Sequence, residues 1–427
     1  MKIKLKENDI QKTIFGEVSS GKEWRVVYFY DYDGTLLYSY TKNDFLNLND
    51  LPVLPDRTGD NLTCDGWNWR LDEIKQHLNA IGGVVNVGAI YHTTDNKTHI
   101  LCEPTETYKT ASIRLTPSLA NDVVVDWGDG STDIWTTASY ATKTHTYTNV
   151  TDSSVFDITI SCTSGTYSWS SYISGGSAGQ SACYTEIKLS NNVTAIGSSC
   201  FQNLYSLKTI SIPNSVERFT GSQAFYNATR IQHVNVPRSI TAFPNQTFHQ
   251  CYALQAVCIP PTIKSTGTNC FKDCRHFTSV TIPKTMTTIG TGTFSQCYGL
   301  KYVAFPDEVP YLANQCFQNC NSLQLINVPN GVTVLNNSCF YYCYALESIV
   351  IPSNVTTIGT SAFMGCEQLR KIYIKAETPP TLGYSAFPSG GVFNTSCVMY
   401  VPRGTLNTYQ SATNWSAYAT MMVEYDY

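Results

Sequence analysis

The most regular feature of the chain is a pattern of apolar and polar positions that repeats every 23 residues. It begins eight times at an apolar residue, with one extra residue in the second copy: Val193, Val216, Ile240, Ile263, Met286, Val309, Val332 and Val355. A phenylalanine recurs in every copy, and a segment like LxxIxIP, such as LKTISIP or LESIVIP, closes it. Self-similarity at such a fixed period predicts stacked repeats, here a solenoid over residues 183–377.

The closing segment of each copy predicts a short strand. Its apolar residues alternate, as expected when one face is buried, and the following proline ends the ladder because it lacks an N–H group. One copy cannot bury its own apolar edge, but copies stacked at about 4.8 Å per strand would share a continuous core roughly 40 Å long. We therefore expect a parallel stack of strands whose stability is shared between neighbouring copies.

The region before the repeats predicts two smaller modules. In residues 1–105, apolar runs flank Asp33-Gly34, a pair that favours a β-hairpin turn, and LDEIKQHL has the apolar spacing of a helix. Residues 106–165 contain short alternating segments such as VVVDWGDGS and FDITISC, which predict a β-sandwich. We expect an α+β module, a sandwich and then a Ser- and Gly-rich linker over 166–182. The chain as a whole is predicted to be mainly β.

Two parts of the chain resemble known families. The repeats are similar to the BspA-like leucine-rich repeat family, because strand, Phe, Cys and Pro positions recur in phase, and residues 378–427 look like that family's C-terminal cap. The sandwich region resembles PKD-type immunoglobulin-like modules through Trp127, Gly128, Asp129, Gly130, His145 and Tyr147. The first resemblance implies a non-enzymatic surface adhesin that binds host or matrix molecules, and the second implies a spacer or adhesive domain.

Composition narrows the classes of partner. Charged residues make up 14% of the chain and the net charge is −4, so no basic field attracts nucleic acid. There is no stretch of about 18 apolar residues that would suggest a membrane span, and no apolar export signal follows the first lysines. We expect neither a nucleic-acid partner nor insertion into a membrane.

One segment suggests enzymatic chemistry. Asp31, Asp33, Gly34 and Thr35 match the DxDGT nucleophile loop of haloacid-dehalogenase-type phosphatases. That reaction needs an α/β domain of about 200 residues that supplies a lysine and further carboxylates for Mg²⁺, and the sandwich begins before such a domain could fit. We therefore expect no enzyme, no catalytic residue and no cofactor, and keep a phosphatase as a minor alternative.

The cysteines favour packing over metal chemistry. Cys270, Cys274 and His276 could be read as zinc ligands. However, Cys274 occupies the same repeat position as Cys251, Cys297, Cys320, Cys343 and Cys366. A small apolar thiol packs well inside a stack of coils. We expect buried cysteine ladders, with disulfides or a metal site as alternatives, and assign no metal ligand.

Candidate binding residues follow from strand geometry, because strand positions between core residues point away from the core. The first set holds His233, Asn235, Tyr302, Gln324, Asn327, Lys371 and Tyr373. Rigid aromatic side chains with polar tips are favoured interface anchors, and a second set places tyrosines at one repeat position in alternate copies. This second set holds Tyr205, Tyr252, Tyr298 and Tyr344. An ordinary solvated surface is an equally good interpretation of either set.

The N-terminal sequence bears on where the protein acts. YDYDGTLLYSYT, LPVLPD and CDGWNW resemble the leading module of repeat proteins in gut-bacterial prophages. This resemblance favours a phage tail or baseplate adhesin in the virion, with the N-terminal module contacting other virion proteins and a homotrimer as the oligomer. The alternative is a bacterial cell-surface or extracellular BspA-like adhesin. In both cases the expected partner is a bacterial or host cell-surface protein or glycan.

Overall fold

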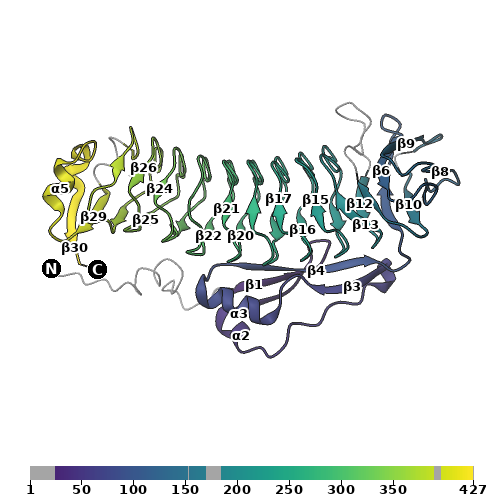
Figure 1. Ribbon diagram of the computed structural model, residues 1–427, viewed down its shortest axis with the longest axis horizontal. Coiled ribbons are helices and arrows are strands. Elements are labelled where there is room, and N and C mark those ends of the chain that lie inside the picture. The colour runs from purple at the N-terminus through teal and green to yellow at the C-terminus, as the bar shows by residue number, and fades with distance from the viewer. Residues whose placement is uncertain (1–24, 152, 170–183, 389–395, 427) are drawn as a thin grey trace.

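The protein forms an elongated solenoid with two further parts near its N-terminal end. The computed structural model describes residues 25–151, 153–169, 184–388 and 396–426. Figure 1 shows a row of stacked coils, with a β-sandwich at one end and a small α+β module lying along one side. The predicted mainly β fold with a parallel strand stack is confirmed.

Each coil contributes one strand to a parallel row, which we call the main strand row. Neighbouring strands pair at intervals of one repeat, as His233 does with Ala256 and Val350 with Tyr373. The strands are β12 (Tyr184–Lys188), β14 (Thr209–Ser211), β16 (His233–Asn235), β18 (Ala256–Cys258), β20 (Ser279–Thr281), β22 (Tyr302–Ala304), β23 (Leu325–Ile326), β25 (Ser348–Ile351), β27 (Lys371–Ile374) and β29 (Val398–Pro402).

A second row of shorter strands follows another side of the coils, and we call it the minor strand row. Its strands pair in parallel as well, for example Thr357 with Thr381. The row consists of β13 (Val193–Ile196), β15 (Arg218–Phe219), β17 (Ala242–Phe243), β19 (Ser265–Thr266), β21 (Thr288–Ile289), β24 (Val334–Leu335), β26 (Thr357–Ile358) and β28 (Thr381–Leu382).

The core of the solenoid contains a ladder of phenylalanine rings. Successive rings stack with centroids 5.1–5.7 Å apart, in the order Phe201, Phe225, Phe248, Phe271, Phe294, Phe317, Phe340, Phe363 and Phe387. All of these rings are buried, so they supply both hydrophobic burial and ring-to-ring attraction. Trp169 lies beyond the first ring and Trp415 beyond the last, and they close the ladder at its two ends.

A ladder of cysteines runs beside the phenylalanines. One thiol per coil donates a hydrogen bond, at 3.1 Å, to the main-chain carbonyl of the phenylalanine in the preceding coil: Cys251, Cys274, Cys297, Cys320, Cys343 and Cys366. Burial raises the pKa of thiols such as Cys274 and Cys320 well above its ordinary value, so they stay protonated donors. The predicted buried ladders are confirmed.

The two alternatives for the cysteines do not fit the structure. Every cysteine in the described ranges is a free thiol, so the disulfide alternative is wrong for them. The zinc reading required Cys270, Cys274 and His276 to converge on one ion. Instead, Nδ1 of His276 lies 2.7 Å from the carbonyl oxygen of Tyr252, on the exposed side of the coil.

The β-sandwich caps the N-terminal end of the solenoid and is continuous with it. One of its sheets runs into the main strand row because β5 pairs with β12, and the other runs into the minor strand row because β11 pairs with β13. Buried residues of both parts form a single hydrophobic cluster. Its strands are β5 (Thr98–Cys102), β6 (Thr110–Pro117), β7 (Val123–Asp126), β8 (Thr132–Ile134), β9 (Ala141–Thr146), β10 (Phe156–Cys162) and β11 (Tyr167–Trp169).

Two of the expected boundaries differ from this arrangement. Residues 1–105 were expected to form one module, yet β5 lies within that range and pairs with sandwich and solenoid strands. The expected linker over 166–182 contains β11, while residues 170–182 lie outside the described part of the chain. An alternating segment predicts a strand but does not say which sheet will accept it, and this is why both boundaries were misplaced.

The N-terminal module is an α+β unit, as predicted. Its sheet has the order β2-β1-β4-β3, and the predicted turn at Asp33-Gly34 joins β1 to β2 with Gly34 at a φ of 87°. The predicted helix is α3, whose residues Ile74 and Leu78 are buried in the core of the module. The elements are β1 (Arg25–Tyr30), β2 (Leu36–Thr41), α2 (Lys42–Leu46), η1 (Thr58–Asp60), β3 (Leu62–Trp67), α3 (Leu71–Ala80) and β4 (Val85–Thr93).

The other end of the solenoid is closed by α5 (Leu406–Ser411), η2 (Ser416–Met421) and β30 (Met422–Tyr425), which pairs with β29. The indole N–H of Trp415 donates to the carbonyl of Pro380, and the hydroxyl of Tyr409 donates to that of Ala376, both at 2.7 Å. These bonds hold the cap against the last coil. Among the described residues, no helix has the length and apolar character that crossing a membrane requires.

Candidate binding surface

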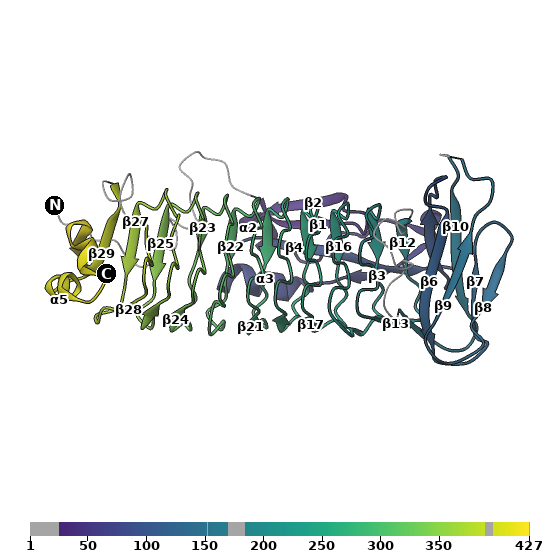
Figure 2. The ribbon, with the colours of Figure 1, turned by 90° about the horizontal axis from the view of Figure 1, so that it is seen from above.

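The N-terminal module covers the first part of the main strand row. Figures 1 and 2 show β4 running along the solenoid, across the strands of successive coils. It contacts β14, β16, β18 and β20. Two sheets therefore face each other here, and the accessible surface of the solenoid depends on where this contact ends.

Side chains of the solenoid bind main-chain groups of β4. The hydroxyl of Ser211 donates to the carbonyl of Tyr91 at 3.0 Å, and the amide of Asn235 donates to that of Ala89 at 2.9 Å. Farther along, the hydroxyl of Thr281 accepts from the N–H of Asn86 at 2.9 Å. Buried peptide groups need such partners, so these bonds fix the position of β4 on the strands.

Side chains of the module bind the solenoid in return. The amide of Asn68 donates to the carbonyls of Val236 and Cys258, at 3.0 and 2.7 Å. Arg238, at the end of a solenoid strand, forms two hydrogen bonds of 2.6 and 2.8 Å with the carboxylate of Glu73 on α3. Bidentate pairing of this kind is directional, and together with the buried amides it makes the contact specific.

The prediction that His233 and Asn235 are exposed binding residues is wrong. Both point away from the core, as predicted, but they are buried beneath the module. The ring of His233 lies 4.9 Å from that of Tyr30, and burial lowers the pKa of the imidazole. A Cβ at Gly34 would overlap this ring, so the glycine allows the close approach. The strand pattern predicts which residues point outward but not what covers them.

Apart from His233 and Asn235 on β16, the covered strands carry small outward side chains. Each covered strand has two outward residues, and the second of them mostly has a short side chain. In the last covered coil this residue is Ala304, which lies directly against Gly83 of the module. Beyond this point the larger Tyr302, Lys371 and Tyr373 appear, among smaller residues such as Ser348. The small covered residues are Thr209, Ser211, Ala256, Cys258, Ser279, Thr281 and Ala304. This excess of small residues at the outward positions of the first coils is visible in the sequence and indicates a covered surface.

Most of the rest of the row is at least partly accessible, and it is named here the open strand surface. It consists of the outward residues of β22, β23, β25, β27 and β29: Tyr302, Leu325, Ser348, Val350, Lys371, Tyr373, Val398 and Tyr400. Three of the predicted binding residues belong to it, namely Tyr302, Lys371 and Tyr373. Lys371 is exposed, whereas Tyr373 is largely covered because its ring stacks on that of Tyr400 at 4.6 Å.

Two further predicted residues lie at the border of this surface. Gln324 is exposed and accepts a hydrogen bond of 2.9 Å from the hydroxyl of Tyr302. Asn327 points outward but its amide bonds to the N–H and carbonyl of Phe305 in the preceding coil, at 2.6 and 2.8 Å. Asn327 therefore joins two coils, which leaves its amide engaged within the fold.

The predicted tyrosine row lies at the corner that precedes the main strand row. Tyr205, Tyr252 and Tyr298 are half-buried, and Tyr344 is 39% exposed. The guanidinium of Arg275, one coil after Tyr252, lies 4.2 Å from the centroid of its ring. Arg275 occupies the same repeat position as these tyrosines but was not predicted from the sequence, because the pattern used there was the recurrence of tyrosine alone.

The phosphatase-like segment has its carboxylates engaged in the fold. Asp31 is fully buried, pairs with Arg57 and accepts the N–H of Tyr32 at 2.8 Å. Asp33 accepts the N–H of Thr35 at 2.8 Å, which is the usual role of an acidic turn residue.

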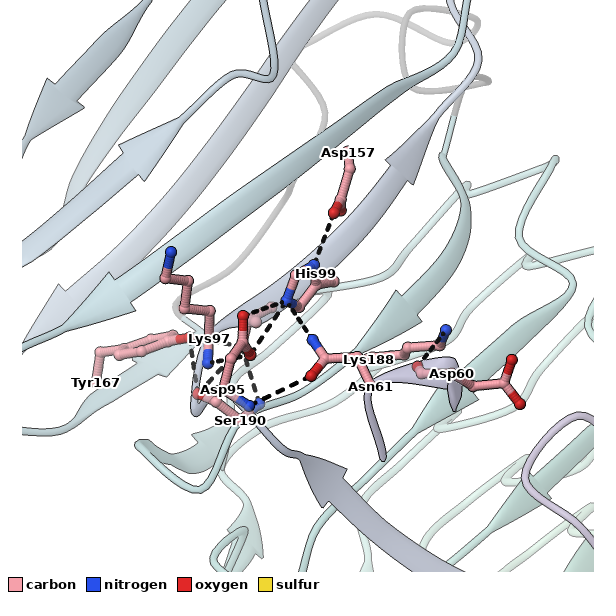
Figure 3. A network of polar contacts seen from close by, with 10 residues as sticks. Asp60, Asn61, Asp95, Lys97, His99, Asp157, Tyr167, Lys188 and Ser190 are labelled. Carbon is pink, nitrogen blue, oxygen red and sulfur yellow. Dashed lines mark hydrogen bonds and ion pairs between the residues drawn. The ribbon is translucent and has the colours of Figure 1, made fainter. Parts of the chain in front are cut away.

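A polar network joins the module, the sandwich and the solenoid (Figure 3). His99 on β5 contacts Asp157 through Nδ1 at 2.8 Å and Asp95 through Nε2 at 3.0 Å, and the Asn61 amide lies 2.8 Å from Nε2. Lys188 of the first solenoid strand donates to the last carbonyl of η1. Burial lowers the pKa of His99, but the hydrogen bonds and charges of the two aspartates outweigh it, so the net pKa is raised.

Comparison with solved structures finds other repeat proteins. A leucine-rich repeat protein from Bacteroides ovatus is 24% identical, with 53% of this chain and 68% of that one covered and a TM-score of 0.42. A leucine rich cell surface protein from Faecalibacterium prausnitzii is 26% identical, with coverages of 49% and 61% and a TM-score of 0.33. The pneumococcal vaccine antigen PcpA is 14% identical, with coverages of 59% and 80% and a TM-score of 0.33.

Comparison with family models gives a more specific result. No curated protein matches the chain significantly. The model of the BspA type leucine-rich repeat region, in six copies, matches residues 177–297 and 264–390, which together span half of the chain. The chain belongs to the BspA type leucine-rich repeat family.

Proposed function

We propose that this protein is a non-catalytic adhesin of the bacterial cell surface or extracellular space, and that its ligand contacts the open strand surface. One observation carries the proposal. Beneath the N-terminal module the outward side chains of the main strand row are small apart from His233 and Asn235, whereas beyond it the row carries large side chains with polar tips, Tyr302, Lys371, Tyr373 and Tyr400, among shorter or apolar ones. Aromatic side chains with polar tips are favoured anchors of interfaces.

Family membership supports this function. Proteins with BspA type repeats are typically adhesin-like surface proteins. A phage tail or baseplate component was our first expectation, and the family match gives it no support. The N-terminal module was expected to contact other virion proteins, but the β4 side of the module is occupied by the solenoid. A module that serves as a fixed cover of the solenoid strands accounts for these contacts better than a module that binds virion proteins.

The absence of catalysis is also part of the proposal. In the DxDGT-like segment, Asp31 is buried against Arg57 and Asp33 closes a turn, so both carboxylates have structural partners. A nucleophile of the phosphatase type has to reach a phosphorus atom in an open site. The pairing of Asp31 supports a binding protein over the phosphatase alternative.

The test is binding of the full chain to intact bacterial cells and intact epithelial cells, measured by flow cytometry. Tyr302→Ala combined with Lys371→Ala removes two large groups of the open strand surface without touching the core. Tyr140→Ser is the matched control, because Tyr140 is 68% exposed on the sandwich. We expect saturable binding that the double variant weakens and the control leaves unchanged. Equal binding by all three proteins would contradict the assignment of the surface.

A further inference from the structure

One coil departs from the repeat pattern in a coordinated way. Each coil from that of Phe201 to that of Phe363 has a residue with positive φ two positions after its phenylalanine. In six of them this residue is Asn, Gln or Asp, with φ between 59° and 63°: Asn203, Asn227, Gln250, Asp273, Gln296 and Asn319. The next coil has Tyr342 there, with φ 56°, and the one after has Gly365. Asn and Asp adopt this conformation readily, whereas a bulky aromatic residue does so at a cost of about 1–3 kcal/mol.

The glycine in the following coil makes room for the tyrosine. A Cβ at Gly365 would overlap the ring of Tyr342, so the ring lies directly over the glycine. Two neighbouring coils thus carry matched substitutions, an unfavourable tyrosine and the glycine that accommodates it. Residues kept in unfavourable backbone regions are concentrated at functional sites.

The ring of Tyr342 is the centre of an aromatic cluster on the surface. Its centroid lies 4.2 Å from that of Tyr341 and 5.3 Å from that of Tyr344, to which it is nearly parallel. Met364, in the next coil, is 37% exposed, and Tyr344 is 39% exposed. We call these residues, Tyr341, Tyr342, Tyr344 and Met364, the tyrosine patch.

The size of the patch indicates what kind of partner it fits. A large side chain offers about 150–250 Å² when fully accessible, and these four are at most two-fifths exposed, so together they present less than about 400 Å². A stable protein interface needs about 800 Å² on each partner. The patch is therefore too small for a protein surface by itself and matches one or two sugar rings.

The chemistry of the patch matches a sugar as well. Aromatic ring faces carry partial negative charge and attract the C–H groups on one face of a pyranose. At the repeat position of Tyr341, the preceding coil has the partly exposed amide of Gln318. Glu367, whose charge helps burial to raise the pKa of Tyr344, adds a carboxylate. These groups can hydrogen-bond the hydroxyl groups at the edge of the ring.

We propose that the tyrosine patch is a binding site for an uncharged oligosaccharide. The inference rests on the proposed adhesin function and assigns a ligand class to a part of the solenoid outside the open strand surface. It also explains why the coil keeps a tyrosine where asparagine or glutamine would be easier to accommodate. Binding would then be maintained at some expense of stability, as is common at functional sites.

The test is binding of the full chain to an array of neutral oligosaccharides built from glucose, galactose, mannose and N-acetylhexosamines, followed by titration calorimetry with the best binder. Tyr342→Asn restores the residue type of the other coils, and Tyr140→Ser is the control, since Tyr140 is 68% exposed on the sandwich, far along the chain from the patch. We expect Tyr342→Asn to raise or keep the melting temperature while weakening binding about tenfold or more, which is 1.4 kcal/mol. The control should bind normally.

Each other outcome has a clear meaning. Absence of binding across the neutral array overturns the inference, as does equal affinity of Tyr342→Asn and the unmodified chain. Binding to a protein in place of a sugar overturns it as well. If the chain still binds intact cells through the open strand surface, only this inference fails. If it binds neither cells nor sugars, the proposed adhesin function fails with it.

Discussion

Removal of one ring from the middle of the phenylalanine ladder should divide the solenoid into two parts. Phe294 is fully buried and stacks on Phe271 at 5.6 Å and on Phe317 at 5.4 Å. Stacked repeats contact only their neighbours, so stability passes from coil to coil through such contacts. The substitution Phe294→Ala removes both stacking contacts at once and leaves a cavity in the core.

The size of the effect follows from the two contributions. Replacing a buried phenylalanine by alanine costs about 3–5 kcal/mol. Stacked aromatic pairs contribute about 0.5–1.5 kcal/mol beyond their buried area, and Phe294 takes part in two of them. We therefore expect a loss near the upper end of the first range, about 5 kcal/mol. Phe277→Leu is the control, because other coils have leucine at this position and the change removes less buried volume than replacement by alanine, so it should cost less than the range of about 3–5 kcal/mol.

Native-state hydrogen exchange is the assay that locates the loss. In Phe294→Ala, amides of the coils between Phe271 and Phe317 should exchange much faster than in the control. The sandwich and the C-terminal cap should change little, since their contacts with neighbouring coils remain. The reasoning is refuted if Phe294→Ala costs no more than Phe277→Leu, or if protection falls equally along the whole chain.

Three further predictions concern the contacts between the parts of the molecule and the thiols. Asn235→Ala should cost about 3 kcal/mol, because it leaves carbonyls of the module unpaired, and limited proteolysis should then cleave the module faster. The pKa of His99 is raised in the folded protein, so its charged form stabilises the fold. This contribution is complete below the unfolded pKa of about 6.5 and is lost as pH rises through the folded value. His99→Gln should therefore reduce the melting temperature at pH 5.5 more than at pH 9. Cys297 should resist alkylation at pH 8 until the chain unfolds, since burial raises the pKa of its thiol, and mass spectrometry of the alkylated protein would detect earlier reaction.

The periodic part of the fold could be predicted from the sequence because its physics is local. A period of 23 residues places equivalent residues of successive coils next to each other. The two strand rows, the phenylalanine ladder and the cysteine ladder therefore all follow from the sequence of one coil. The S–H bond from Cys297 to the carbonyl of Phe271 needs only the geometry of two adjacent coils. The hairpin at Asp33-Gly34 and the helix α3 were equally local.

Contacts between distant parts of the chain could not be predicted in this way. His233 and Asn235 have the outward strand positions of a binding surface, and their burial depends on β4, which is about 150 residues away in sequence. The strands β5 and β11 were recognisable as strands, but the sheets that accept them were not. Tyr342 was visible in the sequence, yet its positive φ and its contact with Gly365 appear only when two coils are stacked.

Lysine footprinting on bound cells tests the central claim, that the ligand contacts the open strand surface. The full chain, free or bound to intact bacterial or epithelial cells, is acetylated briefly and the modified lysines are identified by mass spectrometry. Lys371 is exposed on this surface, whereas Lys284 lies between the main and minor strand rows, with its ammonium group 3.2 Å from Glu308. The account predicts that binding protects Lys371 and leaves Lys284 unchanged. Protection of Lys284 with Lys371 still fully reactive would contradict it.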